Sequence, residues 1–281
     1  MNRRLKQLGG TGLLLASLLL VGPAPGEGSH ESFAVYEDWT TSRTIRSDRW
    51  TARDDGPVQE IGLGIRGHKL VMRQRREGAT ISNVGLLGRS QFIFAKNASA
   101  IDQLEAAFKV RRLVASSCAL NPGNTRVRAA ALALSAFNDG TSIVGQIGDH
   151  FVAVVANREA DSSEPEGVLT VQAFLFRCQD SACFNPLSNI FNLAVGTVLV
   201  GEPFTLRAVW DGANARFLIG VNDQPDVVLA YNPTLDHGPA HGPFAEVHQQ
   251  GVTGNCAAGP TITDVETEVR EVRTNASAIV P

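Results

Sequence analysis

The sequence predicts an all-β protein, an antiparallel sandwich or barrel. Short stretches that favour strands alternate with turns rich in Gly, Pro, Asn and Asp, which is the spacing of antiparallel sandwiches and barrels. Residues 204–210 alternate apolar and polar side chains, residues 211–214 supply a turn, and residues 216–221 continue as the second strand of a hairpin. With 281 residues and 43% hydrophobic content, the chain can bury a sizeable core.

Further strands are expected along the chain at residues 69–75, 168–176 and 261–273. The segment 129–134 is rich in Ala and Leu, which favour helices, but the alternation of Arg126, Val127 and Arg128 before it favours a strand. Residues 98–107 also fit a short helix. The pattern in 261–273 changes phase by one residue, which indicates a bulge near Glu266.

The first 26 residues have the features of a cleavable export signal. Arg3, Arg4 and Lys6 precede an apolar stretch over residues 8–21, and small residues follow it. The alternative is an uncleaved membrane anchor, but this stretch is short for a span of about 20 residues. We expect one mature domain over residues 31–275, periplasmic or secreted, with no membrane span after cleavage.

The four cysteines fit export, because oxidising compartments favour disulfides. Four cysteines allow three pairings. Cys178 and Cys183 flank a short polar loop that a local bridge could close, which leaves Cys118 to pair with Cys256. Zinc binding is the alternative, but the spacings lack two tight cysteine pairs.

Three passages carry a resemblance to a known superfamily: residues 33–50 as an opening strand and turn, residues 201–223 as a central hairpin, and residues 264–269 as a closing strand. They resemble the concanavalin A-like lectin/glucanase superfamily, close to its laminin-G-like jelly rolls. The resemblance implies two antiparallel sheets packed face to face, with the closing strand paired near the start. The superfamily includes sugar-binding modules, glycoside hydrolases, polysaccharide lyases and structural modules, so the fold does not choose a function.

The glucanase branch of this superfamily uses carboxylates spaced Glu-x-Asp-x-x-Glu, and this chain has that spacing at Glu159, Asp161 and Glu164. A retaining hydrolase needs two carboxyl groups about 5 Å apart on one strand face. Here Pro165 and Gly167 follow, so we expect an exposed hairpin tip and no catalytic role for these acids.

A second acidic group alternates along the last predicted strand. Asp264, Glu266 and Glu268 share one face, because side chains alternate with period two. They could form an acid/base cluster or a cation site. A solvent-facing stripe, relieved by Arg270 and Arg273, is the preferred interpretation.

The densest group of potential metal ligands combines His237, His241 and His248 with Asp236 and Glu246. Glycine and proline among them exclude a helix, so we expect a mobile polar loop. Tyr231, beside Asn232, is the best candidate for an exposed ring that stacks on a sugar; the alternative is a core residue at a strand end. Trp39, Trp50 and Trp210 are expected at core or turn positions.

These observations led to one functional prediction and one alternative. The first is an exported, non-catalytic binding or structural module of the bacterial envelope that is not an enzyme, with a glycan or envelope component as partner. Its candidate binding residues are Tyr231, Asn232, His237, His241 and His248. The alternative is a polysaccharide-active glycoside hydrolase or lyase. No cofactor is expected, and nothing in the sequence supports a structural calcium. A net charge of -3 without a basic stripe argues against nucleic acid.

Overall fold

The computed structural model describes residues 33–55, 62–82, 85–120, 123, 125–136, 150–178, 186–231 and 245–276. These residues belong to one compact unit, Ser32–Pro281. The proposed export signal, residues 1–26, lies outside them and stays a prediction. In the described part of the chain, no helix is long and apolar enough to cross a membrane.

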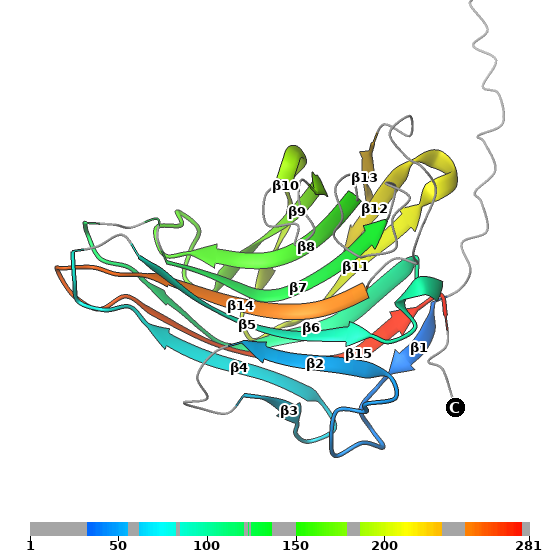
Figure 1. Cartoon of the computed structure of the whole chain (residues 1–281), viewed down its shortest axis with the longest axis horizontal. Coiled ribbons are helices and arrows are strands. Elements are labelled where there is room, and N and C mark those ends of the chain that lie inside the picture. Colours follow the sequence, from blue (N-terminus) through cyan, green and yellow to red (C-terminus); the bar gives the residue numbers. More distant parts are fainter. Residues whose placement is uncertain are drawn as a thin grey trace, which may run out of the picture. The chain divides into compact units, whose positions relative to one another are not determined.

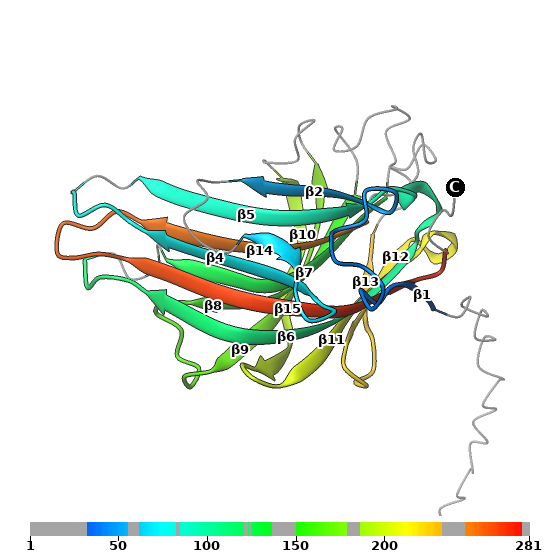
Figure 2. The same cartoon turned by 90° about the horizontal axis from the view of Figure 1, so that it is seen from below.

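The all-β prediction is confirmed: the strands form two antiparallel sheets (Figure 1). Sheet A has a central path of seven strands, and Figure 2 shows its middle strands side by side. Their order is β13 (Val227–Ala230), β12 (Arg216–Val221), β11 (Pro203–Asp211), β6 (Gln103–Ser116), β15 (Ile262–Thr274), β4 (Leu70–Glu77) and β3 (Leu63–Ile65). The opening strand β1 (Ala34–Glu37) pairs with the closing strand β15, as the resemblance implied.

Sheet B has seven strands, and the chain passes repeatedly between the two sheets. Its order is β10 (Pro186–Leu199), β9 (Val168–Cys178), β8 (His150–Glu159), β7 (Arg126–Ala136), β14 (Ala245–Gly254), β5 (Leu86–Ala95) and β2 (Trp50–Asp55). The Ala- and Leu-rich segment 129–134 lies within β7, so the prediction of a strand there is confirmed. Of the segment 98–107, where a short helix was considered, only η1 (Ala98–Ala100) is helical, and β6 begins three residues later.

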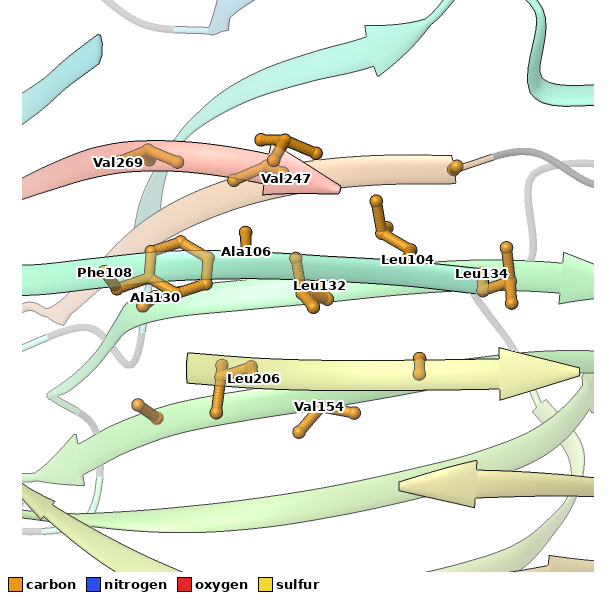
Figure 3. Packing of buried hydrophobic residues seen from close by; sticks show 14 of the residues in the cluster. Leu104, Ala106, Phe108, Ala130, Leu132, Leu134, Val154, Leu206, Val247 and Val269 are labelled. Carbon is orange, nitrogen blue, oxygen red and sulfur yellow. The ribbon is translucent and has the colours of Figure 1, made fainter. Parts of the chain in front are cut away.

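The core lies between the two sheets and is built from the alternate residues of each strand. In β9, Leu169, Val171, Ala173 and Leu175 are fully buried, as their spacing predicted. Figure 3 shows side chains of β6, including Phe108, in the same cluster as those of β7. Burying a Val, Leu or Phe side chain stabilises the fold by about 1.5–3 kcal/mol, so this layer supplies the main driving force.

The predicted hairpin is confirmed as β11 and β12, whose pairing runs from Leu206 opposite Val221 to Asp211 opposite Arg216. Its tip is the short η3 (Gly212–Asn214), where the Asp211 carboxylate accepts a hydrogen bond from the backbone N–H of Asn214. Ala215 then takes a left-handed conformation, with φ of 49°.

Three strands carry register shifts that meet inside the sandwich. They lie between His248 and Gln250 in β14, between Arg128 and Ala130 in β7, and between Glu266 and Thr267 in β15. The shift in β15 confirms the predicted bulge near Glu266. A bulge changes which side chains face outward. These shifts therefore determine which side chains lie on the face of each sheet that is turned away from the other sheet.

The buried amide of Gln249 connects the three bulges. Its Nε2 donates to the Thr267 hydroxyl at 2.9 Å and to the Ala129 carbonyl at 3.4 Å, while its Oε1 accepts from Gln74 at 3.1 Å. The Thr267 hydroxyl also donates to the Ala129 carbonyl, at 2.6 Å. Buried polar groups are retained when they are hydrogen-bonded, and this amide is bonded at both ends.

A disulfide links Cys118, which follows β6 of sheet A, to Cys256, which follows β14 of sheet B. This pair was predicted from the sequence, and it joins the ends of strands from opposite sheets. Cys183 lies outside the described residues, so the Cys178–Cys183 bridge stays a prediction.

Candidate functional site

The outer face of sheet B, which is turned away from sheet A, carries a second apolar cluster. Alternation along β7 and β8 places Leu132 and Val154 in the main core, so their neighbours point to the opposite side. Those neighbours are small and buried: Ala131, Ala133, Ala153 and Val155 form a cluster of their own, with Phe174 packed against it.

Strand pairing arranges this face in three rows that cross five strands, β5, β14, β7, β8 and β9. The first row is Phe94, Glu246, Ala133, Ala153 and Phe174. The second is Phe92, His248, Ala131, Val155 and Gln172. The third is Ser90, Gln250, Arg128, Asn157 and Thr170. Residues that are far apart in the sequence therefore meet on one surface.

A carboxyl and an imidazole lie side by side on β14. Oε1 of Glu246 is 2.9 Å from Nδ1 of His248, and each side chain is only 7% exposed. The contact lacks the direction of a hydrogen bond, so it is an ion pair when the imidazole is protonated. A carboxylate and an imidazole side by side are groups that general acid/base catalysis uses.

Aromatic rings flank the pair. The ring centroids of Phe92 and Phe94 are 5.6 Å apart, nearly parallel, and the Phe92 ring is 5.4 Å from that of His248. Phe174 lies on the far side of the small apolar cluster. Phe92, Phe94 and Phe174 are all partly exposed, so a ligand on this face meets these rings before it reaches the buried pair.

The third row is polar. The Arg128 guanidinium lies over the Phe174 ring, 5.9 Å from its centroid, and Arg128 is paired in register with Gln250 on one side and Asn157 on the other. Gln250 donates to the Ser90 hydroxyl at 3.1 Å, and Asn157 donates to Gln172. This row can offer amide and guanidinium groups to a ligand.

Tyr231 corrects the expectation of an exposed sugar platform. It is 8% exposed and packs in the core, with its ring centroid 4.3 Å from that of His150. Its hydroxyl accepts a hydrogen bond from Trp210 Nε1 at 2.9 Å. The polar tip is thus satisfied internally, which lets the ring be buried at the strand end.

The predicted histidine loop is only partly visible. Asn232, Asp236, His237 and His241 lie outside the described residues. His248 and Glu246, in contrast, belong to β14 and are buried, so placing them in a mobile loop was wrong: the run from Ala245 pairs with strands on both sides. Across the described ranges, no three His, Cys, Asp or Glu side chains are placed to hold a metal ion.

Glu159, Asp161 and Glu164 lie at the turn between β8 and β9, where a hairpin was expected. Glu159 and Asp161 are exposed. The Arg158 guanidinium holds the turn by donating to the backbone carbonyls of Glu164, Pro165 and Val168, at 2.8–3.0 Å. The carboxylates do not converge on one strand face, and their lack of a catalytic role stays a prediction.

The acidic stripe of β15 is neutralised by neighbouring strands more than by its own arginines. Asp264 pairs with Arg112 at 2.9 Å, and Glu268 pairs with Arg111 at 2.9 Å and Lys69 at 3.2 Å. Burial alone would raise the pKa of Glu268, but hydrogen bonds from Arg111 and Lys69 outweigh it and lower that pKa. An ionised, paired carboxylate is a poor proton donor, so this stripe is structural.

The outer face of sheet A holds a cavity of about 280 Å³. Its lining includes Glu105, Arg207, Glu271 and Arg273. The charges compensate one another, because Arg207 pairs with Glu105 and Asp226, and Arg273 pairs with Glu271. No aromatic ring is among the lining residues, so this cavity is less suited to a sugar than the outer face of sheet B.

Sequence reasoning missed Phe92, Phe94, Arg128 and Phe174 as site residues. Their partners on the neighbouring strands come from elsewhere in the sequence, such as Gln250 opposite Arg128. The available signal was local: Phe92 and Phe94 alternate with the buried Ile93, which marks them as facing outward.

No protein family model matches the sequence, and no curated protein matches it. Solved structures do share the fold. LamAcat from Zobellia galactanivorans is 10% identical over 86% of this chain and 96% of its own, with a TM-score of 0.47. The catalytic domain of a laminarinase, an endo-1,3-β-glucanase from Thermotoga petrophila, is 11% identical over 87% and 98%, with a TM-score of 0.45. The exoplasmic domain of VIP36, in a Ca²⁺- and mannose-bound form, is 8% identical over 79% and 82%, with a TM-score of 0.34.

These neighbours contradict the first functional prediction, a non-catalytic module that is not an enzyme, because glucanase catalytic domains stand among them. At this level of identity the likeness concerns architecture, and the choice of chemistry depends on the side chains of the outer face. The chain has an all-β, two-sheet antiparallel jelly-roll fold.

Proposed function

We propose that this protein is an exported, polysaccharide-active enzyme that cleaves glycosidic linkages on the outer face of sheet B, with His248 and Glu246 as its proton-transfer pair. The observation that carries the proposal is the 2.9 Å approach of Glu246 Oε1 to His248 Nδ1 beside aromatic rings. The Cys118–Cys256 disulfide supports export, because such bonds persist in oxidising compartments.

The roles follow from the geometry. Glu246 lies beside Nδ1 of His248. The imidazole is the group that accepts a proton and returns it during bond cleavage. The rings of Phe92 and Phe94 offer a flat apolar surface for the faces of sugar rings.

The described residues of this face do not offer a retaining pair of carboxylates. Apart from Glu246, its acids are Asp55, at the end of the edge strand β2, and Glu159, at the hairpin end of β8. In the strand pairing, neither acid lies opposite a neighbour of Glu246. The retaining mechanism, a double displacement, needs two carboxyl groups about 5 Å apart. We therefore assign proton transfer to the histidine and its carboxylate.

The test is turnover of a polysaccharide panel by the oxidised protein, with new reducing ends and unsaturated products both measured. The panel contains neutral β-glucans, uronate-containing polysaccharides and sulfated galactans. On the substrate that is cleaved, His248→Asn and Glu246→Gln should each lower kcat by about 100-fold or more, the usual contribution of a positioned acid/base group.

The control is the double variant Glu159→Gln/Glu164→Gln, which removes two carboxylates from the hairpin and should keep wild-type turnover. No cleavage of any member of the panel, or full activity in His248→Asn, would contradict the proposal. Cleavage that is lost in the hairpin double variant would instead move the chemistry to Glu159 and Glu164.

A further inference from the structure

Arg128 is a cation without a carboxylate partner in the described structure. It is only partly exposed, and none of its nitrogens lies within 4.0 Å of an acidic oxygen of a described residue. Its contacts are the Phe174 ring and its strand neighbours. Most other arginines of the two sheets are paired, for example Arg89 with Asp54 and Arg112 with Asp264.

The surroundings of the Arg128 guanidinium disfavour its charged form. Burial, and then the neighbouring charge of Arg126, lower the pKa of Arg128. A partly desolvated charge with no opposite charge destabilises a fold unless a further partner binds there. Gln250 and Asn157 flank it in register with amide groups, which can donate to the same oxygen atoms.

We propose that Arg128, with Gln250 and Asn157, forms a subsite for an anionic group on the glycan, a carboxylate or a sulfate ester. This proposal rests on the proposed function and names its substrate class: an acidic polysaccharide rather than a neutral glucan. The subsite lies one row from the Glu246–His248 pair, a separation of about 7 Å along the strands, so one bound chain can contact both.

A guanidinium presents parallel N–H groups that match the paired oxygens of a carboxylate or sulfate. The Phe174 ring beneath it attracts the guanidinium charge. The anion would supply the opposite charge that the side chains of the described residues do not place beside Arg128.

The experiment measures binding by calorimetry with three probes: oligogalacturonides for carboxylates, carrageenan oligosaccharides for sulfate esters, and laminari-oligosaccharides as the neutral comparison. We expect one anionic class to bind, with an affinity that falls as salt rises. Arg128→Gln should weaken that binding by about 10- to 100-fold, the contribution of charge-assisted hydrogen bonds. Arg128→Lys should retain part of it.

Two further variants keep the test decisive. Asn157→Asp leaves Arg128 in place and supplies an internal carboxylate, so it should also weaken anion binding. Arg75→Gln makes the same change of net charge on the outer face of sheet A, where Arg75 is exposed, and should bind like wild type. Thermal unfolding of each variant identifies any that fail to fold.

The outcomes separate this proposal from the proposed function. Tight binding of laminari-oligosaccharides alone, or anion binding that survives both Arg128→Gln and Asn157→Asp, would overturn the anionic subsite while leaving cleavage at His248 open. Anion binding that depends on Arg128, without turnover of any acidic polysaccharide, would overturn the enzyme and keep the subsite.

Discussion

At the scale of single residues, the two tyrosines show how a polar ring is buried when its hydroxyl has a partner. Tyr36 and Tyr231 are both buried, and each hydroxyl has a partner: Tyr36 donates to the Arg49 carbonyl at 3.0 Å, and Tyr231 accepts from Trp210. From the sequence, Tyr231 resembled a surface ring because it precedes a polar segment. Its burial depends on packing against His150 and Phe217, residues that only the folded sheets bring near.

Tyr36 gives a pH prediction. Burial raises the pKa of Tyr36 to about 12, from 10 in the unfolded chain. The stability that this shift contributes is therefore fully present below pH 10 and is lost as the pH rises towards 12. The loss should be roughly 2–3 kcal/mol, since each pKa unit corresponds to about 1.4 kcal/mol. Urea unfolding between pH 8 and 12 measures this loss of stability. In the Tyr231→Phe variant Tyr36 is the only tyrosine, so tyrosinate absorbance then reports its ionisation directly. Ionisation of Tyr36 at pH 10 would contradict the prediction.

His248 shows what the sequence could and could not indicate at this scale. It was identified as a candidate ligand, but together with His237 and His241 as part of a loop. The run from Ala245 to Gly254 has few apolar residues, because Gln249 and Gly251 occupy inward positions, so its pattern does not resemble a core strand. Its place in β14 follows from pairing with β5 and β7, which is information that lies elsewhere in the chain.

At the scale of elements, strands with regular alternation were predictable, whereas the outward faces of the bulged strands β7 and β14 were not. The hairpin of β11 and β12 and the strand β9 alternate without interruption and were found where expected. In β7 and β14, one extra residue changes the face of everything after it. The outward positions of Arg128 and His248 depend on those shifts, which is why the site could not be assembled from periodicity alone.

The Gln249 amide should therefore be important for stability. Gln249→Met keeps the size of the side chain but leaves the Gln74 amide N–H without its acceptor and removes the donor to the Met72 carbonyl. We expect a loss of about 2–4 kcal/mol in the free energy of unfolding, the cost of one or two unsatisfied buried groups. The adjacent Gln250→Met, on the outer face, should change stability by less than about 0.5 kcal/mol.

Urea unfolding of the two variants compares the glutamines directly. Equal stability of both variants would show that the amide of Gln249 does not hold the bulges together. A loss confined to Gln249→Met supports its role in keeping His248 and Arg128 on the same face.

At the scale of the whole molecule, the two sheets are joined covalently at one end. The Cys118–Cys256 bridge closes a loop with a sequence separation of 138 residues. In the chain-entropy model a loop of that length stabilises the fold by about 5 kcal/mol. The sequence could indicate this pairing because export, an even cysteine count and a second, local pair restrict the choices. The function was less accessible, because the fold is shared by binding modules and enzymes, and only the composition of the outer face distinguishes them.

The central claim is that this protein binds and cleaves a polysaccharide on the outer face of sheet B. The most direct measurement is a crystal structure of the Glu246→Gln variant with an oligosaccharide of the polysaccharide that the wild type cleaves. The account predicts sugar rings across β5, β14 and β7, with one ring against Phe92 or Phe94 and an anionic group at Arg128. An oligosaccharide bound instead in the cavity lined by Glu105 and Arg207, on the outer face of sheet A, would contradict it.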